Sequence, residues 1–309
     1  MTNKIIAIQG NNLNNLNPLT DTSIFLAKSG ENKGYKIFYY EPENLSIKNK
    51  KVFANGSFIK IDYSKRKFFK IIKKTNIDLS KVKFILVRQD PPFNLEYIST
   101  TYILDTIKNK VRVINNPTSI RNVSEKLYSM KFINFMPDTI FTKKVEDILY
   151  FYKKYKKIIL KPIHSYSGND IIYVNNKLNK KLILKFIKKH GHIMCQKFLP
   201  KIKFGDKRVF IINGKICGCI SRVPKKGSIL SNMSKGAKPK LIKLTKKEIK
   251  ISNIIAKDLV KEDIYFAGID FIDEKLNGDI NVTSPTGLKT FFDLSNINLA
   301  DYFWKGLRA

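Results

Sequence analysis

The sequence predicts an α/β fold, α+β overall, whose first part is a parallel-sheet domain. Apolar runs at 4–8 and 35–40 enclose a loop and a helix-forming stretch, which is the β-loop-α-β order that opens a parallel sheet. The chain has 309 residues, too many for one small domain. After Pro117 the pattern of elements changes, so we place a boundary near residue 120 and expect domains at 1–120 and 121–309.

In the first domain, the helix should start at one of the capping candidates Asp21, Thr22 and Ser23 and end at Gly34. The stretch 52–62 is predicted to be a hairpin, because Asn55-Gly56 is a preferred two-residue turn. The other predicted elements are a strand at 84–87 that stops before Pro91-Pro92, a helix at 97–108, and a strand at 111–114 that Asn116-Pro117 ends.

The second domain is expected to alternate short strands and helices. Asn213-Gly214 and Asn277-Gly278 are predicted to be turns between neighbouring strands. The predicted helices are 124–132, 145–154, 177–190 and 244–260, and the predicted strands are 139–142, 157–161, 193–198, 207–212, 215–221, 267–272 and 279–282.

Composition limits the function classes. The formal net charge is +33, which alone would suggest a nucleic-acid or anionic-membrane partner. We favour a compositional bias instead, because the basic residues are mostly lysines spread along the chain, without an Arg-rich tail. No apolar stretch is long enough to span a membrane. Three cysteines cannot build a disulfide framework, which indicates the reducing cytoplasm.

Two groups of charged residues stand where strands of the predicted sheets end. Arg88 and Asp90 follow the strand at 84–87, at the sheet edge where ligands of open α/β folds bind, although a purely structural turn is an equal alternative. Lys161 follows a buried strand, and Lys126 lies on a predicted helix. A lysine held at a sheet edge can bind a phosphate.

Two further segments could contact a nucleotide. The run from Gln196 to Leu199 leaves an apolar strand and could offer backbone groups to an adenine edge, although a core strand fits the spacing equally well. Arg208 and Arg222 lie on the two strands of the predicted hairpin and could grip phosphate or carboxylate bidentately. The polar stretch 223–239 that follows suits a mobile lid.

The most specific pattern consists of oxygen donors on two adjacent strands, Asp270, Asp279 and Asn281. Residues 279 and 281 are two apart and therefore point to one face of the sheet. Such a set suits Mg²⁺ that bridges nucleotide phosphates. The histidines and cysteines lack zinc-ligand spacing, and neither a GxxxxGK[ST] loop nor a nucleophile elbow is present.

Together with several short motifs, these residues make the chain similar to the prokaryotic-type glutathione synthetases of the ATP-grasp superfamily over nearly its whole length. The motifs are Arg88-Gln89-Asp90-Pro91-Pro92-Phe93, Thr101-Tyr102-Ile103-Leu104, Asn116-Pro117, Glu125-Lys126-Leu127, Ile159-Leu160-Lys161-Pro162, Gly205-Asp206-Lys207-Arg208 and Ile280-Asn281-Val282-Thr283-Ser284-Pro285.

The resemblance implies a pre-ATP-grasp N-terminal domain and an ATP-grasp domain with a lid at about 121–200 and a metal-binding sheet at about 201–309. It implies cytoplasmic ligation of γ-glutamylcysteine and glycine through an acyl-phosphate, with ATP and Mg²⁺ (Mn²⁺ as an alternative), by a dimer or tetramer without a nucleic-acid or membrane partner. The implied ATP-binding residues are Lys126, Lys161, Gln196, Lys197, Phe198, Leu199, Asp206 and Asn232; the metal ligands Asp270, Asp279 and Asn281; the catalytic residues Arg208 and Arg222; and the substrate-binding residues Arg88, Ser284 and Lys289.

The chain departs from the family pattern at several positions. The segment from His164 to Asp170 stands where the family has a glycine-rich DGxGG loop and keeps one glycine, Gly168. Asp279 replaces Glu, Lys289 replaces Arg, and Leu230 stands where Arg is usual. Two alternatives therefore stay open: an ATP-grasp ligase with another γ-glutamyl or amino-acid substrate, and a non-catalytic paralogue that binds nucleotides or polyanions.

Overall fold

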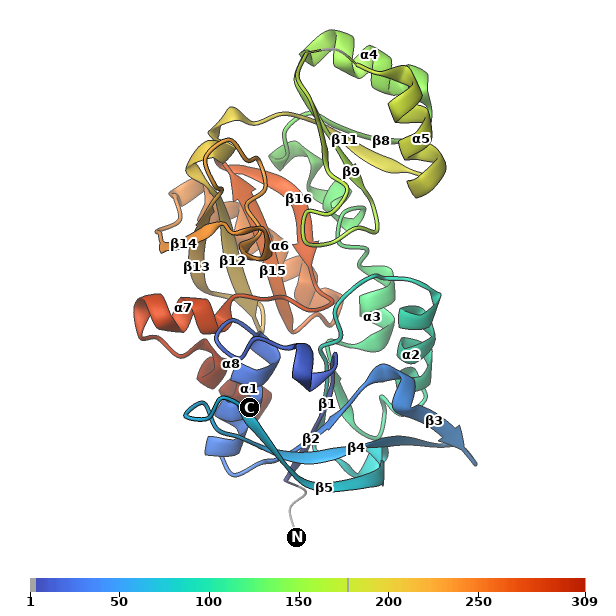
Figure 1. Cartoon of the computed structure of the whole chain (residues 1–309), viewed down its shortest axis with the longest axis vertical. Helices are drawn as coiled ribbons and strands as arrows, with labels where there is room; N and C mark the ends of the chain where they lie inside the picture. Colours follow the sequence, from blue (N-terminus) through green and yellow to red (C-terminus); the bar gives the residue numbers. More distant parts are fainter. Residues whose placement is uncertain (1–3, 177, 309) are drawn as a thin grey trace.

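The protein is built on three sheets that follow one another along the chain (Figure 1). The computed structural model describes residues 4–176 and 178–308. We call the sheets the N-terminal, the middle and the C-terminal sheet; they are formed by residues 5–114, 139–197 and 206–281. Together with the helices packed on them, they confirm the mixed α/β fold class that the sequence predicts.

The N-terminal sheet has a parallel centre and an antiparallel edge. The parallel strands are β1 (Ile5–Gln9), β2 (Lys36–Tyr40), β6 (Phe84–Val87) and β7 (Arg112–Ile114), and the antiparallel strands are β3 (Leu45–Lys48), β4 (Lys51–Ile61) and β5 (Phe69–Asp78). Helices α1 (Thr22–Asn32), α2 (Leu95–Asp105) and α3 (Pro117–Asn122) accompany the sheet. The carboxylate of Asp21 caps α1, as expected, by accepting from the N–H of Ile24.

The predicted hairpin at 52–62 is wrong. Asn55 and Gly56 lie inside the single long strand β4, where Gly56 pairs with Thr75 of β5. A Cβ at position 56 would lie 2.4 Å from the carbonyl oxygen of Tyr39, so a glycine is needed because two backbones approach closely there. The chain reverses between β4 and β5 instead.

The middle sheet is antiparallel and carries two helices. Its strands are β8 (Thr139–Thr142), β9 (Ile158–Pro162), β10 (Ile172–Val174) and β11 (Ile193–Lys197), in the order β10-β9-β11-β8. Its helices are α4 (Val145–Tyr155) and α5 (Lys180–His190). Apolar side chains on one face of each helix pack on the sheet, among them Ile183 and Phe186 of α5. Of the predicted helix 177–190, the first residue lies outside the described part of the chain.

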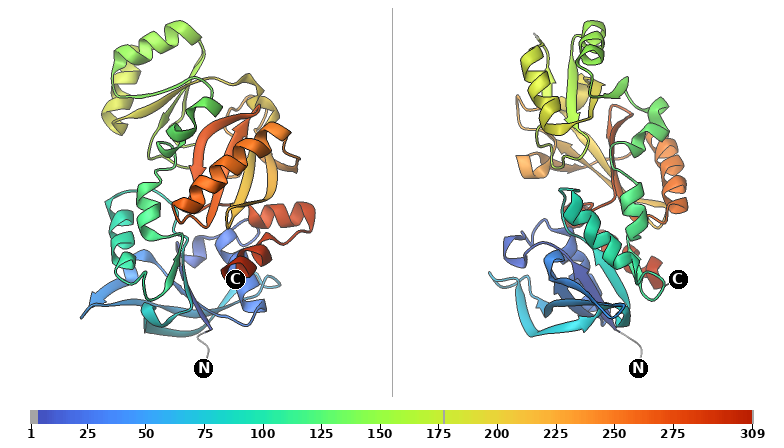
Figure 2. Two further views of the ribbon diagram at one scale, coloured as in Figure 1. Left: turned by 180° about the vertical axis from the view of Figure 1, so that it is seen from behind. Right: turned by 90° about the vertical axis from the view of Figure 1, so that its right-hand side faces the viewer.

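The C-terminal sheet is also antiparallel, in the order β14-β13-β12-β15-β16. The strands are β12 (Asp206–Ile212), β13 (Lys215–Val223), β14 (Lys238–Leu241), β15 (Phe266–Ile272) and β16 (Lys275–Asn281), and α6 (Lys246–Lys261) covers one face of the sheet (Figure 2). Asn213-Gly214 is the predicted turn between β12 and β13.

The predicted turn at Asn277-Gly278 is wrong, because both residues lie inside β16. Asp273 and Glu274, both with positive φ, make the turn from β15. Gly278, with φ +86°, belongs to an irregularity of the pairing: between the pairs Ile269–Ile280 and Phe271–Leu276, Asp270 alone stands opposite residues 277–279. This bulge places polar residues of β16 beside Asp270.

The predicted helix at 124–132 is also wrong. The chain forms α3 earlier, with Asn116 as its cap and Pro117 in its first turn, and then a 3₁₀ segment from Tyr128 to Phe135. The carbonyl of Glu125 accepts from the N–H of Ile280 in β16, so this backbone serves the C-terminal sheet rather than a helix of its own.

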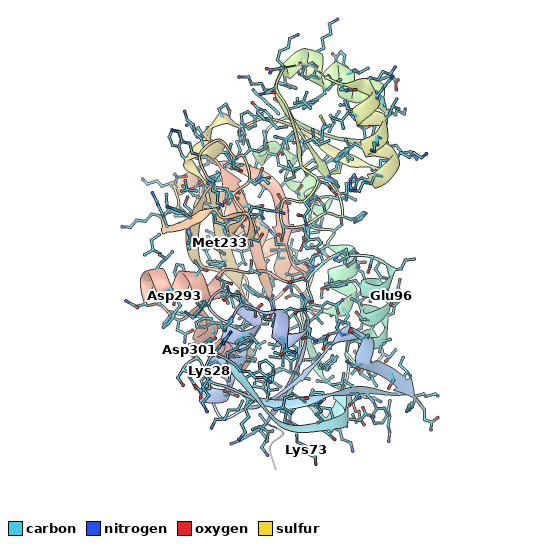
Figure 3. The ribbon with its side chains drawn as sticks, in the orientation of Figure 1. Lys28, Lys73, Glu96, Met233, Asp293 and Asp301 are labelled. Carbon is cyan, nitrogen blue, oxygen red and sulfur yellow. The ribbon has the colours of Figure 1, made fainter. Side chains whose placement is uncertain are left out.

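The last two helices, α7 (Leu288–Ser295) and α8 (Leu299–Arg308), return to the N-terminal sheet (Figures 1 and 2). Trp304 of α8 is buried, and its indole N–H donates to the carbonyl of Leu26 in α1 at 3.0 Å. Asp301 of α8, labelled in Figure 3, accepts from Ser29 of α1 and forms an ion pair with Lys33. One apolar core therefore joins the two ends of the described chain.

Candidate functional site

The residues that the sequence singles out converge on one cavity between the middle and C-terminal sheets, which we call the first cavity. All thirteen residues expected to bind nucleotide or metal or to act in catalysis line it: Lys126, Lys161, Gln196, Lys197, Phe198, Leu199, Asp206, Arg208, Arg222, Asn232, Asp270, Asp279 and Asn281.

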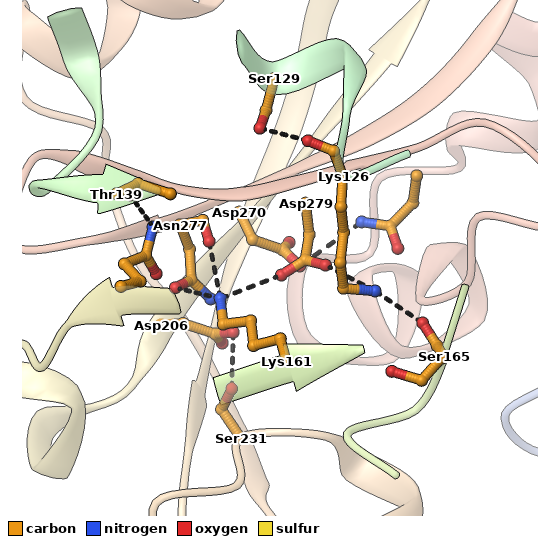
Figure 4. A network of polar contacts seen from close by, with 12 residues as sticks. Lys126, Ser129, Thr139, Lys161, Ser165, Asp206, Ser231, Asp270, Asn277 and Asp279 are labelled. Atoms are coloured by element: carbon orange, nitrogen blue, oxygen red, sulfur yellow. Dashed lines mark hydrogen bonds and ion pairs between the residues drawn. The ribbon is translucent and has the colours of Figure 1, made fainter. Parts of the chain in front are cut away.

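Two buried lysines flank Asp279 (Figure 4). The Nζ of Lys161, from β9, lies 3.6 Å from one carboxylate oxygen of Asp279, and the Nζ of Lys126 lies 3.5 Å from the other. Lys161 also donates to the side chain and the carbonyl of Asn277, at 3.0 and 2.7 Å. Burial lowers the pKa of Lys161, while the charge of Asp279 acts against that shift. In these positions the two ammonium groups can bind a phosphate in the first cavity.

Arginines and aspartates alternate beside the lysines. Arg208 of β12 makes a bidentate ion pair with Asp270 of β15, at 2.5 and 2.8 Å. Arg222 of β13 makes another with Asp206 and also reaches Asp270 at 3.0 Å. The strand pairing explains these contacts, since Arg208 is opposite Asp270 and Asp206 is opposite Arg222. Ser231 adds a hydrogen bond to Asp206 at 2.6 Å.

Burial acts differently on the two carboxylates of this network. It raises the pKa of Asp206 above its ordinary value, although Arg222 counteracts the shift. Burial would raise the pKa of Asp270 as well, but two arginines, Arg208 and Arg222, face it and hold its pKa at about 2. Asp270 is therefore an anion whose negative charge is already shared with two cations.

The expected metal ligands fit Mg²⁺ by their chemistry. Asp279 and Asn281 lie on the same face of β16, and Asn281 contacts Asp270 through its amide nitrogen at 3.5 Å, which leaves its amide oxygen for a cation. Within residues 4–176 and 178–308, no three His, Cys, Asp or Glu side chains form a metal cage. A cation here would rely on nucleotide phosphates for further ligands, as Mg²⁺ usually does.

The segment from Gln196 to Leu199 lines the first cavity on the side of the middle sheet. Gln196 donates to Thr139, and the rings of Phe198 and Tyr173 lie 4.3 Å apart. The N–H groups of Lys197 and Phe198 are already hydrogen-bonded within the lid region. An adenine ring would therefore contact the other groups of this segment.

A second cavity, of about 550 Å³, opens beside the first and extends to the N-terminal domain. Ser284 lines it together with Arg208 and Arg222. The other two expected substrate residues do not line either cavity. Arg88 is buried and holds the chain by donating to Ser23 and to the carbonyl of Pro285, and Lys289 pairs with Asp293 on α7.

The segment that replaces the glycine-rich loop lies between the two cavities. Tyr166 and Ser167 line both of them. The carbonyl of Ser165 accepts from Lys126 at 2.6 Å. Gly168 has φ +70°, and a Cβ there would lie 2.6 Å from the side-chain oxygen of Asn232, so this loop packs closely against the segment 223–239.

Residues that the sequence reasoning missed also line the first cavity. Asn277 binds Lys161 but is predicted to be part of a turn; its spacing of two from Asp279 and of four from Asn281 could have revealed it. Glu125 lines both cavities, and the only feature of the sequence that could have indicated this is its position directly before Lys126.

Comparisons with known proteins show to which family the chain belongs. The family model of the prokaryotic glutathione synthetase N-terminal domain matches residues 5–121, and that of the prokaryotic glutathione synthetase ATP-grasp domain matches residues 125–296. The chain is 32% identical to the glutathione synthetase of Mesorhizobium japonicum, over 98% of both chains. It is 34% identical to that of Buchnera aphidicola subsp. Acyrthosiphon pisum, over 97% of this chain and 96% of the relative.

Solved structures agree on the fold. The ATP-grasp ligase PsnB complexed with a minimal precursor aligns with a TM-score of 0.65 and 12% identity, covering 100% of this chain and 99% of that one. D-alanyl-alanine synthetase A from Vibrio cholerae aligns with a TM-score of 0.61 and 13% identity, covering 100% and 98%. In the described residues, no helix has the length and hydrophobicity to cross a bilayer. The ATP-grasp fold expected from the sequence is thereby confirmed, and the chain belongs to the prokaryotic glutathione synthetase family.

Proposed function

We propose that this protein joins γ-glutamylcysteine to glycine in an ATP-dependent reaction that passes through an acyl-phosphate and releases ADP and phosphate. The observation that carries the proposal is the convergence of two lysines and two arginines on Asp270 and Asp279 in the first cavity; the arginines, Arg208 and Arg222, also line the second cavity. Such a site can hold a nucleotide on one side and a carboxylate substrate on the other. The membership of the chain in the prokaryotic glutathione synthetase family supports the same reaction.

In this proposal, the side chains act mainly by binding and by charge. Lys126 and Lys161 bind the transferred phosphate. Both ammonium groups lie beside Asp279 in the first cavity, where their positive charges can attract the phosphate oxygens. Asp270, Asp279 and Asn281 would hold Mg²⁺, with Mn²⁺ as an alternative, and the ion would neutralise phosphate charge. Arg208 and Arg222 orient the substrate carboxylate and stabilise the negative charge that develops on it.

The remaining assignments follow from position. Gln196, Lys197, Phe198 and Leu199 contact the adenine, Asp206 and Asn232 complete the nucleotide site, and Ser284 contacts the substrate. Arg88 acts by positioning the segment at Pro285 rather than by touching substrate. Lys289 has no place in either cavity, so we assign it no role in binding. The enzyme is proposed to be a cytoplasmic homo-oligomer without a nucleic-acid or membrane partner.

A second candidate is a ligase that uses another acceptor amine or γ-glutamyl acid. The observation that favours it is the replaced loop, because Tyr166 and Ser167 add side chains to the boundary of the two cavities. The test is to incubate the protein with ATP, Mg²⁺, γ-glutamylcysteine and a panel of amines, and to measure phosphate release and product mass. Glutathione as the main product supports the proposal, whereas a different product with a higher kcat/KM supports the second candidate.

A further inference from the structure

The two cavities meet at a junction formed by seven residues that line both of them: Glu125, Tyr166, Ser167, Arg208, Arg222, Asn232 and Asn281. In the proposed reaction the acyl-phosphate would form here, because the phosphate would come from the first cavity and the substrate carboxylate from the second. Among these seven residues, Glu125 is the one with a carboxylate.

Three hydrogen bonds fix one oxygen of the Glu125 carboxylate, and within residues 4–176 and 178–308 the other oxygen has no hydrogen bond or ion pair. Oε1 accepts from the N–H groups of Val282 and Thr283, at 3.0 and 3.1 Å, and from the hydroxyl of Thr283 at 2.8 Å. The next residue, Lys126, directs its ammonium to Asp279. Adjacent residues thus supply a cation to the phosphate side and an anion to the junction.

The other carboxylates around the two cavities are engaged differently. Asp206, Asp270 and Asp279 are paired with arginines or lysines. Asp21 caps α1, and Asp90 accepts from Asn11; both line the second cavity but not the junction.

Resting on the proposed function, we infer that Glu125 binds the ammonium of the incoming amine and takes its proton. The amine enters as an ammonium ion, which cannot attack a carbonyl. Transfer of one proton to Glu125 frees the nitrogen lone pair, which forms the C–N bond. The C–O bond to phosphate then breaks, its electron pair leaves with the phosphate, and the second proton goes to that phosphate. Glu125 returns its proton to water.

The test compares two nucleophiles on the Glu125→Gln variant, which keeps an oxygen that can accept from Val282 and Thr283. Hydroxylamine is largely unprotonated at neutral pH and needs no base, so it traps the acyl-phosphate as a hydroxamate. With ATP, Mg²⁺ and γ-glutamylcysteine present, we expect the rate with glycine to fall about 10²-fold or more, while hydroxamate formation changes less than about tenfold. The matched control is Glu96→Gln, an exposed residue on α2 (Figure 3).

The outcomes separate the alternatives. Equal loss with both nucleophiles in Glu125→Gln, while the wild type forms hydroxamate, shows a structural role for Glu125 and overturns the inference. Unchanged activity with glycine overturns it as well. A wild-type protein that forms no hydroxamate from γ-glutamylcysteine refutes the proposed function itself, and the inference falls with it.

Discussion

Arg208 and Asp270 face each other across the paired strands β12 and β15 and form a buried, two-point ion pair. The pair occupies both oxygens of a carboxylate that is also proposed to bind Mg²⁺. In the proposed mechanism, cation binding to Asp270 would therefore compete with Arg208 and Arg222, and nucleotide phosphates would offer these arginines a new partner. The proposal thus gives this one contact both a structural and a catalytic role.

Asp270→Asn should destabilise the protein, because Arg208 loses its anionic partner in a buried position. Breaking a buried ion pair by removing one partner costs about 3–5 kcal/mol, and the free energy of unfolding should fall by that order. Urea denaturation measures it. Asp273→Asn is the matched control, since Asp273 pairs with Lys201 in an exposed turn, and its effect should stay below about 1 kcal/mol. Similar losses in the two variants would contradict this account.

Acid should remove the same stabilisation. The folded protein holds the pKa of Asp270 at about 2, below its ordinary 3.8. Because the folded state binds this proton less readily than the unfolded state, the stabilisation is fully present above about pH 4 and is lost as the pH falls through about 2. The difference in unfolding free energy between wild type and Asp270→Asn should shrink over this range. A difference independent of pH would show that Asp270 is not the group responsible.

Asp279→Asn should abolish ATP-dependent phosphate release while the fold persists. The substitution removes a proposed metal ligand and the anion between Lys126 and Lys161, so we expect a loss of about 10²-fold or more. Asp279→Glu adds one methylene and restores the family residue, and its rate tests the metal position. Circular dichroism checks the fold. A near-normal rate in Asp279→Asn would remove this site from the mechanism.

The replaced loop should seal the site less tightly than glycines would. Ser165, Tyr166 and Ser167 offer hydroxyls to phosphate, but their side chains limit how closely the backbone can approach it. We expect measurable ATP hydrolysis with γ-glutamylcysteine present and the acceptor absent, and less of it in a variant that carries a glycine-rich loop. Steady-state phosphate release measures both. Negligible hydrolysis in both proteins would show that the natural loop seals equally well.

The charge of +33 should give only weak, nonspecific binding to duplex DNA. Affinity that rests on lysine–phosphate contacts falls steeply with salt, so binding seen at low ionic strength should disappear at physiological ionic strength. Fluorescence anisotropy with unrelated duplexes measures the salt slope. Tight binding to one sequence at physiological salt would instead support a polyanion-binding function.

Sequence reasoning succeeded where chemistry and local context agree. Lys161 and Asp270 are charged residues in apolar strands, which need partners, and both lie in the first cavity. It failed at the Asn-Gly dipeptides, because Asn-Gly occurs inside strands as well as in turns. Asn55-Gly56 and Asn277-Gly278 are turn dipeptides, yet one allows a close strand contact and the other a bulge.

Long-range placement was harder to foresee. The position of Arg88 depends on Pro285, almost two hundred residues later, and that of Glu125 depends on Val282 and Thr283. Neither contact leaves a periodic pattern in the local sequence. The predicted domain boundary near residue 120 stays a prediction, since α7 and α8 pack back on the N-terminal domain.

That return of α8 to α1 has a consequence for biosynthesis. Phe303, Trp304 and Leu307 of α8 share a core with Ile6 and Ile8 of β1, so β1 lacks part of its apolar cover during translation until α8 has been synthesised. The nascent N-terminal domain therefore keeps apolar surface exposed to solvent while the nucleotide-binding part is synthesised. Translation that stalls before Trp304 should therefore yield an aggregation-prone chain, even when every proposed metal and nucleotide ligand has already been synthesised.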